Sequence, residues 1–334
     1  MVIGNEYSTA VPGTELCYRP TPSPVRHAMT LLAIVAALVL EQLRPLSERR
    51  ALYAPLNRYA RFLESQFNDG EHRHGAVAWI VLVSVPVVGL FVLHWWLVAA
   101  YPALALVLDV AVLYVTAGFR QFSHFFTDIH LALRMGELDR ARHLLAEWRG
   151  RSGERLSSAE VARLAIEEAL VASHRHVFAP LCWFVVLGPA GAMLYRLSLF
   201  LSRHWEPGAD PEHGAFGEFA RQAFRVLDFV PLRLTAAAFA IVGDFEDAVF
   251  CWRGQAHRWP EEGSGILLAS GGGALGVRLG MPIPGEGEPD DRPELGLGDE
   301  ADADFMQSTI GLLWRSLVLG LLLLALLWVA SWVS

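Results

Sequence analysis

The chain contains no lysine, so all 27 of its Lys or Arg side chains are arginine. This absence excludes three devices: a phosphate-binding-loop lysine, a Schiff-base lysine and a lysine general base. Arginine keeps its charge and binds carboxylate or phosphate through a bidentate fork. Any anion site in this protein must therefore use arginine side chains or backbone N–H groups.

Cysteine is also scarce, with three residues far apart at Cys17, Cys182 and Cys251. No two of them form a Cys-x-x-Cys pair, so neither a zinc site nor a disulfide framework is indicated. We predict no metal centre. The formal net charge of −8 argues against nucleic acid as a partner.

Charged residues make up only 19% of the chain, and hydrophobic residues make up 53%. Soluble domains carry about 25% charged residues. The mean hydropathy is +0.34, and the apolar residues are concentrated in runs. The sequence therefore predicts an all-α protein, a polytopic membrane helix bundle in contact with a lipid bilayer.

Six apolar runs predict about five to six membrane spans, some of them broken by proline or glycine. The runs are 29–43, 76–97, 103–118, 177–201, 226–250 and 312–333, and we expect Pro231 and Arg233 to interrupt the fifth. Residues 1–28 are rich in proline and predict a disordered N-terminal extension, with either Met1 or Met29 as the true start. Residues 29–334 then form the membrane domain.

Arginine-rich stretches follow the first and third runs. By the positive-inside rule, segments 44–75 and 119–176 are predicted to be cytoplasmic, with the 202–225 loop and the C-terminus outside. Within 119–176, residues 119–148 predict an amphipathic helical segment, and Ser157 is the predicted N-cap of another helix. Segment 251–311 is polar, with a glycine-rich part and an acidic part.

Two charged residues lie at the fifth run, Asp228 and Arg233, with Pro231 between them. Charges at membrane depth are costly and usually face a cavity or a partner. The pattern predicts a polar site in which Arg233 holds an anionic group. The alternatives are a structural Asp–Arg pair at a helix break, or simple interfacial placement.

The helix before the fourth run brings Glu167 and His174 to one face. A carboxylate and an imidazole on one face suit acid–base work or a metal, although this is a weak metal pattern and solvated helix charges are common. Further on, Gly271-Gly272-Gly273 could wrap a phosphate with backbone N–H groups. A flexible re-entrant turn explains the three glycines equally well.

Several short motifs follow one another in the second half of the chain. They are Ala179-Pro180-Leu181, Pro189-Ala190-Gly191-Ala192, Tyr195-Arg196, Pro231-Leu232-Arg233-Leu234-Thr235-Ala236 and Gly273-Ala274-Leu275-Gly276-Val277-Arg278-Leu279-Gly280. In these motifs the chain resembles the CobD/CbiB family of bacterial inner-membrane proteins, and the resemblance covers most of residues 29–330.

The resemblance implies an inner-membrane, multi-pass protein of cobalamin biosynthesis. Members of that family attach aminopropanol, or its phosphate, to adenosylcobyric acid through an amide bond. An enzyme of this kind would use a corrinoid substrate and ATP, and an adenosylcobinamide(-phosphate) synthase-like ligase is the activity implied. Residue chemistry and resemblance together select Glu167, Asp228 and Arg233 as catalytic candidates. The substrate-binding candidates are Tyr195, Arg196, Gly272, Gly273 and Arg278.

The chain departs from the family pattern at one place. In the family, the helix before the Ala-Pro-Leu block ends in Glu-Asn-x-x-Asp, whereas the aligned segment here is Val171-Ala172-Ser173-His174-Arg175. The carboxylates and the amide of the family motif are absent from this segment, and the earlier Glu167 survives. This loss predicts weak or absent cobinamide-phosphate synthesis.

The middle of the chain also resembles AmpE, a related inner-membrane protein. The residues concerned are Asp228-Phe229-Val230-Pro231-Leu232-Arg233-Leu234 and the later Gly243-Asp244-Phe245-Glu246. AmpE proteins are signalling modulators associated with β-lactamase induction and peptidoglycan recycling. A non-enzymatic membrane modulator is therefore the alternative function.

Overall fold

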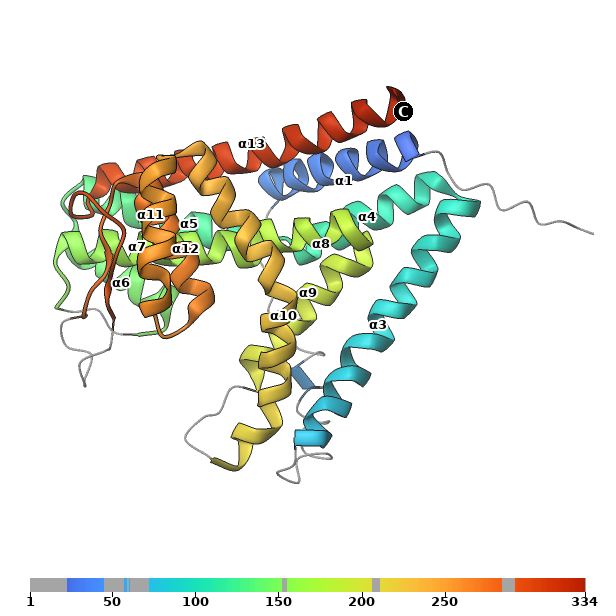
Figure 1. The fold of residues 1–334 in the computed structure, drawn as a ribbon, viewed down its shortest axis with the longest axis horizontal. Helices are drawn as coiled ribbons and strands as arrows, with labels where there is room; N and C mark the ends of the chain where they lie inside the picture. The colour runs from blue at the N-terminus through green and yellow to red at the C-terminus, as the bar shows by residue number, and fades with distance from the viewer. Residues whose placement is uncertain are drawn as a thin grey trace, which may run out of the picture.

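The structure, a computed structural model, describes residues 23–44, 57–58, 60, 72–151, 155–205, 211–283 and 292–333. Within these ranges the chain is mostly helical (Figure 1), which confirms the predicted fold class. Three helices are long and apolar enough to cross a membrane: His74–Ala100, Ser158–Leu187 and Ala303–Trp332. Three shorter apolar helices accompany them, at Ala28–Leu43, Pro102–Thr116 and Gly263–Leu275.

The elements follow one another with short connections. They are α1 (Ser23–Leu43), α3 (His72–Ala100), α4 (Pro102–Thr116), α5 (Phe119–Arg134), α6 (Leu138–Arg149), α7 (Ser158–Ser173), a π-helix (His174–Phe178), α8 (Ala179–Leu187), α9 (Pro189–His204), α10 (Pro211–Val242), α11 (Phe245–Gln255), a 3₁₀ turn (Ala256–Arg258), α12 (Glu262–Leu275), β1 (Leu279–Gly280), β2 (Glu294–Leu295) and α13 (Ala303–Val333).

The first helix begins earlier than the sequence predicts. α1 starts at Ser23, so residues 23–28 are helical and the prediction of a disordered stretch is wrong for them. Residues 1–22 of that predicted extension lie outside the described residues. α1 packs against α13, and the two run in opposite directions along one edge of the molecule (Figure 1).

A predicted single span at 177–201 is in fact two helices, α8 and α9. Gly188 separates them with φ 65° and ψ −152°, a conformation that is essentially reserved for glycine. Pro189 then starts α9, and a Cβ at Gly191 would overlap the carbonyl oxygen of Trp183. These residues let the chain reverse direction, so that α9 packs back against α8.

The fifth predicted span, by contrast, contains one continuous helix where the sequence predicts a break. α10 continues through Pro231 and Arg233 to Val242, so the predicted interruption at these two residues is wrong. The break comes instead at Gly243 and Asp244, and the Asp244 side chain caps α11 by accepting from the Asp247 N–H.

α7 begins with the predicted Ser157 N-cap, where Ser157 and Glu160 form a capping box. It passes through the π-helix directly into α8, so the expected boundary at residue 176 falls inside one continuous helical stretch. Because α7 packs against α5, α6, α12 and α13, this stretch runs through the largest core of the molecule.

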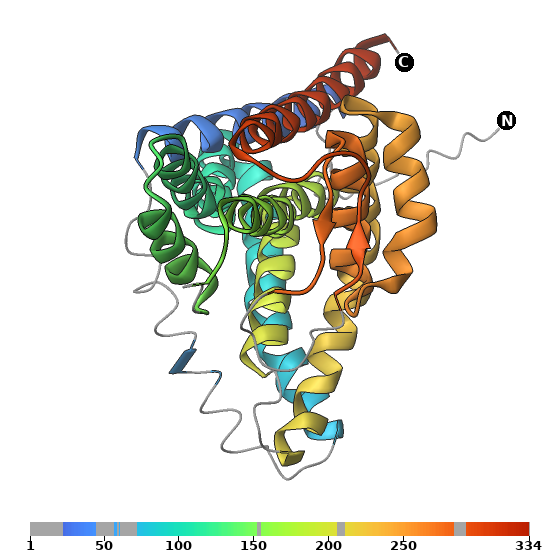
Figure 2. The same ribbon diagram turned by 90° about the vertical axis from the view of Figure 1, so that its left-hand side faces the viewer.

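The three glycines of the polar segment 251–311 do not form a turn. Gly271, Gly272 and Gly273 lie inside α12, where backbone N–H groups bond to the preceding turn. A Cβ at Gly273 would sit 2.5 Å from the Asp247 carbonyl oxygen of α11. The predicted flexible turn is therefore wrong, and these glycines permit close helix packing, while a contact of Gly272 and Gly273 with a substrate phosphate stays a prediction. The antiparallel pair β1–β2 lies beside α12 (Figure 2).

One contact contradicts the predicted sidedness. Trp79, near the start of α3, packs edge-on against Phe219 of α10 with ring centroids 5.6 Å apart. Phe216 packs against Trp205 at the end of α9. The start of α3, the end of α9 and the start of α10 therefore lie together. This contact contradicts the predicted placement of the 202–225 loop on the side opposite the segment that leads into α3.

Candidate functional site

A buried polar network links the π-helix, α9 and α10. His174 opens the π-helix and is fully buried, and Tyr195 of α9 is fully buried as well. Asp228 of α10 lies between them and is 9% exposed. A π-helix is frequently found at functional sites, because its wider turn shifts the side-chain register of the helix.

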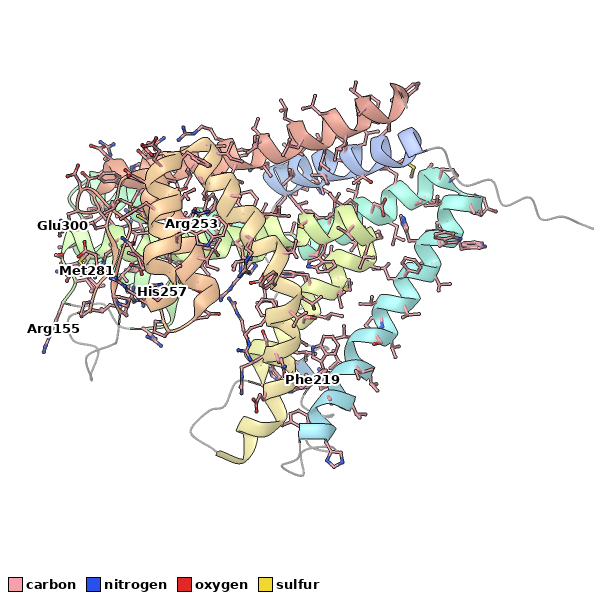
Figure 3. All side chains as sticks on the ribbon, in the orientation of Figure 1. Arg155, Phe219, Arg253, His257, Met281 and Glu300 are labelled. Atoms are coloured by element: carbon pink, nitrogen blue, oxygen red, sulfur yellow. The ribbon has the colours of Figure 1, made fainter. Side chains whose placement is uncertain are left out.

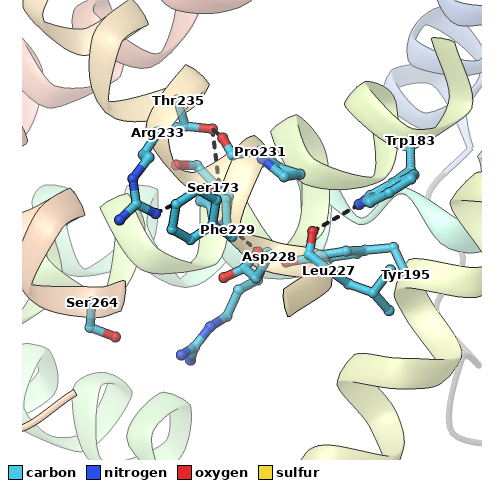
Figure 4. Close-up of polar contacts among 12 residues, drawn as sticks. Ser173, Trp183, Tyr195, Leu227, Asp228, Phe229, Pro231, Arg233, Thr235 and Ser264 are labelled. Carbon is cyan, nitrogen blue, oxygen red and sulfur yellow. Dashed lines mark hydrogen bonds and ion pairs between the residues drawn. The ribbon is translucent and has the colours of Figure 1, made fainter. Parts of the chain in front are cut away.

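Asp228 receives two hydrogen bonds on one oxygen. The Tyr195 hydroxyl donates to Oδ1 of Asp228 at 2.8 Å, and Nε2 of His174 donates to the same oxygen at 2.8 Å, because a carboxylate only accepts. Nδ1 of His174 lies 2.9 Å from the hydroxyl oxygen of Thr235. Figure 4 shows Tyr195 beside Asp228, with Thr235 further along the same helix.

The second oxygen of Asp228 is different. Among the described residues, Oδ2 has no hydrogen-bond or ion-pair partner. Oδ1 of the carboxylate is thus hydrogen-bonded inside the protein, and Oδ2 is left to contact a ligand. Such a group can accept a hydrogen bond, or a proton, from a bound ligand without first breaking an internal contact.

Arginine side chains surround this network. Arg175 and Arg196 lie within electrostatic range of the Tyr195 hydroxyl, and Arg203 lies within range of both arginines. Arg196 is buried, and its Nη1 donates to Nδ1 of His176. Arg175 pairs with Glu261 at 2.9 Å. The surroundings of Asp228 therefore carry positive charge suited to an anionic group.

Glu167 is not part of this network. Both of its oxygens are engaged: the Gly280 N–H donates to Oε1 at 2.8 Å, and Arg292 donates to Oε2. Arg163 lies 4.0 Å from Oε1. Seven residues separate Glu167 from His174, which is about 10 Å along a helix. The structure therefore does not bring the two predicted carboxylates together.

The other predicted residues also lie apart from Asp228. The guanidinium of Arg233 lies over the Phe229 ring, 3.5 Å from its centroid, and Nη1 donates to the Phe229 carbonyl at 3.1 Å. Among the described residues, no ion pair joins Asp228 to Arg233. Arg278 lies 3.9 Å from Glu294 of β2. Of the substrate-binding candidates, only Tyr195 contacts Asp228, with Arg196 next to it.

Sequence reasoning missed how His174, Thr235 and Trp183 act around Asp228. His174 was placed on a face with Glu167, but its partners are Asp228 and Thr235. The indole N–H of Trp183 donates to the Leu227 carbonyl at 3.1 Å. Among the described residues, no cluster of three or more His, Cys, Asp or Glu side chains could hold a metal ion.

Comparisons with known proteins agree on one family. The model of the CobD/CbiB protein family matches residues 33–313. The cobalamin biosynthesis protein CobD of Stutzerimonas stutzeri is 33% identical over 297 residues, which is 88% of this chain and 96% of that protein. The CobD protein of Chromobacterium violaceum is 37% identical over 224 residues, 67% of this chain and 70% of that protein.

These matches do not confirm the AmpE-like features of the middle of the chain. No solved structure matches the chain.

Proposed function

The chain belongs to the CobD/CbiB family, and from this premise we propose that it is a multi-pass inner-membrane enzyme of bacterial cobalamin biosynthesis. The proposed reaction joins aminopropanol, or its phosphate, to adenosylcobyric acid through an amide bond. The observation that carries the proposal is the Asp228 carboxylate, which is held on one oxygen by Tyr195 and His174 and presents the other.

Amide formation requires a group that accepts a proton from the attacking amine. The amine nitrogen attacks the activated carboxyl carbon, a C–N bond forms, the bond to the leaving oxygen breaks, and the nitrogen loses a proton. Oδ2 of Asp228 would accept a hydrogen bond from the amine and then take that proton. Holding the two reactants in this geometry contributes up to about 7–11 kcal/mol to lowering the barrier.

The arginines supply the complementary charge. Arg175 and Arg196 would hold a phosphate or a propionate carboxylate of the substrates beside Asp228. ATP would activate the carboxyl group of the corrinoid. Because the chain has no lysine, the ATP phosphates would have to be bound by arginine and backbone N–H groups.

Glu167, Arg233, Gly272, Gly273 and Arg278 carry no role in this proposal, and their part in the chemistry stays a prediction. The missing Glu-Asn-x-x-Asp group still predicts weak synthesis. The proposed Asp228 site predicts measurable synthesis. The two expectations can be separated by experiment.

Complementation tests the proposal directly. The chain should restore corrinoid-dependent growth to a bacterial strain that lacks its cobinamide-forming gene. Asp228→Asn should abolish growth at normal membrane levels, and in purified protein it should lower the rate of amide formation about 10²–10⁴-fold. Asp139→Asn is the matched control, because its carboxylate lies on the surface with a side chain that is 96% exposed.

Two outcomes would contradict the proposal. One is no growth with the unaltered chain, although it accumulates normally in the membrane. The other is full growth with Asp228→Asn. The first would favour a non-catalytic role in the same pathway, and the second would remove Asp228 from the chemistry.

A further inference from the structure

We propose that Trp183 is a positioning residue for Asp228. Its indole N–H replaces the backbone hydrogen bond that Pro231 cannot make in α10, and it thereby fixes the helical turn that carries the Asp228 carboxylate. The catalytic consequence of this role rests on the proposed function, whereas the hydrogen bond itself does not.

Pro231 leaves one carbonyl of α10 without its helical donor. Pro231 lies inside α10 and has no N–H, so it cannot donate to the carbonyl of Leu227, four residues earlier. The proline ring also crowds that carbonyl and pushes it outward. A buried carbonyl without a donor costs about 1–3 kcal/mol, and such a site usually kinks the helix.

Trp183 of α8 supplies the missing donor. Its Nε1–H donates to the Leu227 carbonyl at 3.1 Å, and this bond joins two helices 44 residues apart in the chain (Figure 4). The hydrogen bond explains how α10 continues past Pro231 without a break. It also explains why a tryptophan is needed here, since phenylalanine would fill much of the same space without a donor.

The same side chain also supports the other partner of Asp228. Trp183 packs against a cluster of four buried residues, Ala179, Tyr195, Leu199 and Phe224. Tyr195 of this cluster donates to Asp228. Trp183 therefore touches the site from two directions: through the carbonyl of Leu227, the residue directly before Asp228, and through the packing of Tyr195.

A double-mutant test isolates the hydrogen bond. Trp183→Phe keeps an aromatic ring but removes the donor, and we expect the rate of amide formation to fall about 10- to 100-fold, as expected for a misplacement of about 1 Å. Pro231→Ala restores a backbone N–H that can bond to the Leu227 carbonyl. The double variant Trp183→Phe/Pro231→Ala should therefore be more active than Trp183→Phe alone.

Trp79→Phe is the matched control. The indole N–H of Trp79 is buried and has no acceptor among the residues that the structure describes, so its loss should leave the rate unchanged. A merely structural loss of aromatic packing would affect both tryptophan variants, and Pro231→Ala would not rescue it.

A second measurement does not depend on activity. Backbone hydrogen exchange of the α10 peptide around residues 225–235 should accelerate in Trp183→Phe and return toward the wild-type rate in the double variant. If the unaltered chain forms no amide, the proposed function fails and this measurement still decides on the hydrogen bond. Unchanged exchange in Trp183→Phe, or activity losses that simply multiply in the double variant, would overturn the inference.

Discussion

Glu167 and Asp228 are both buried carboxylates, but their surroundings give them different roles. Glu167 uses both oxygens to hold Arg292 and the Gly280 N–H, which ties α7 to the β1–β2 pair. Among the residues that the structure describes, Asp228 uses only one oxygen for hydrogen bonds. A carboxylate with both oxygens engaged stabilises structure, whereas one with an open oxygen can act on a ligand.

Glu167→Gln tests this division at the residue scale. Breaking a buried ion pair leaves Arg292 without its charge partner, so the free energy of unfolding should fall by about 3–5 kcal/mol. The control is Glu137→Gln, which removes an exposed pair with Arg140 and should cost less than about 1 kcal/mol. Denaturant unfolding in detergent measures both. Unchanged stability with lost amide formation would instead place Glu167 in the chemistry.

Part of the site could be predicted from single residues. Asp228 stood out because a charge in an apolar run needs a partner or a function. Its partner could not be read from the sequence, because His174 is 54 residues away and the contact depends on the π-helix and on how α10 packs. Arg233 stood out by the same rule, but it bonds within its own helix. Sequence shows which charges need an explanation, and packing decides what that explanation is.

At the scale of elements, Gly188 and Pro189 decide where α9 goes. They turn the chain back after α8, which brings Tyr195 to Asp228. His94 of α3 lies on the outer side of this turn, with Nε2 3.6 Å from where a Cβ of residue 188 would be. His94 in turn lies 3.0 Å from the buried carboxylate of Asp109 in α4. α3 and α4 thus pack beside the turn between α8 and α9.

Gly188→Ala should therefore destabilise the protein. A Cβ at this position has room beside His94, so the cost comes from the backbone, which holds φ 65° and ψ −152°. Such a conformation costs a non-glycine residue about 1–3 kcal/mol. Gly89→Ala in α3 is the control, because it lies inside a helix with open space around it and should be neutral or slightly stabilising. Thermal unfolding in detergent would show the difference, and equal effects of the two substitutions would contradict it.

Glycine and proline in the sequence mark positions where a helix is disfavoured, but they do not show whether the helix ends there. α8 ends at Gly188, whose backbone conformation strongly favours glycine, and Pro189 starts the next helix. Pro231 and Pro86 stay inside their helices. For Pro231 the reason is a donor from another helix, Trp183, and such compensation cannot be seen in the local sequence.

At the scale of the whole molecule, charge and apolar surface are separated. Arg155, Arg253, His257 and Glu300 lie at one end, whereas α3, α4 and the C-terminal half of α13 form the other end (Figure 3). Exposed apolar side chains cover those helices, among them Val85, Val92 and Trp96 of α3 and Leu322 and Leu326 of α13. The separation matches a protein whose polar end stands outside the bilayer on one side.

The positive-inside rule placed segments 44–75 and 119–176 on one side and the 202–225 loop on the other, although the start of α10 contacts the start of α3. The loop and its flanks carry both signs of charge, so counting arginines gives no clear sidedness there. Counting spans added a second error, because the run 177–201 was taken as one crossing although α9 returns from Gly188. The second error arises because a helix that turns back inside the protein has the same composition as one that crosses.

The corrected arrangement makes a prediction that reporter fusions can test. Reporters fused after Arg61 and Arg149 should be cytoplasmic. A reporter inserted between Trp205 and Pro211 should now be cytoplasmic too, because Trp205 and Phe216 pack together and Phe219 contacts Trp79 at the start of α3. A fusion after Ser334 should lie outside, since α13 runs antiparallel to α1 and ends beside the beginning of α1 (Figure 1).

An external signal at 206–210 together with a cytoplasmic signal at Arg61 would require α3 and α10 to start on opposite sides of the membrane. Their contact would then have to be abandoned, and with it the path of α10 that carries Asp228 to His174.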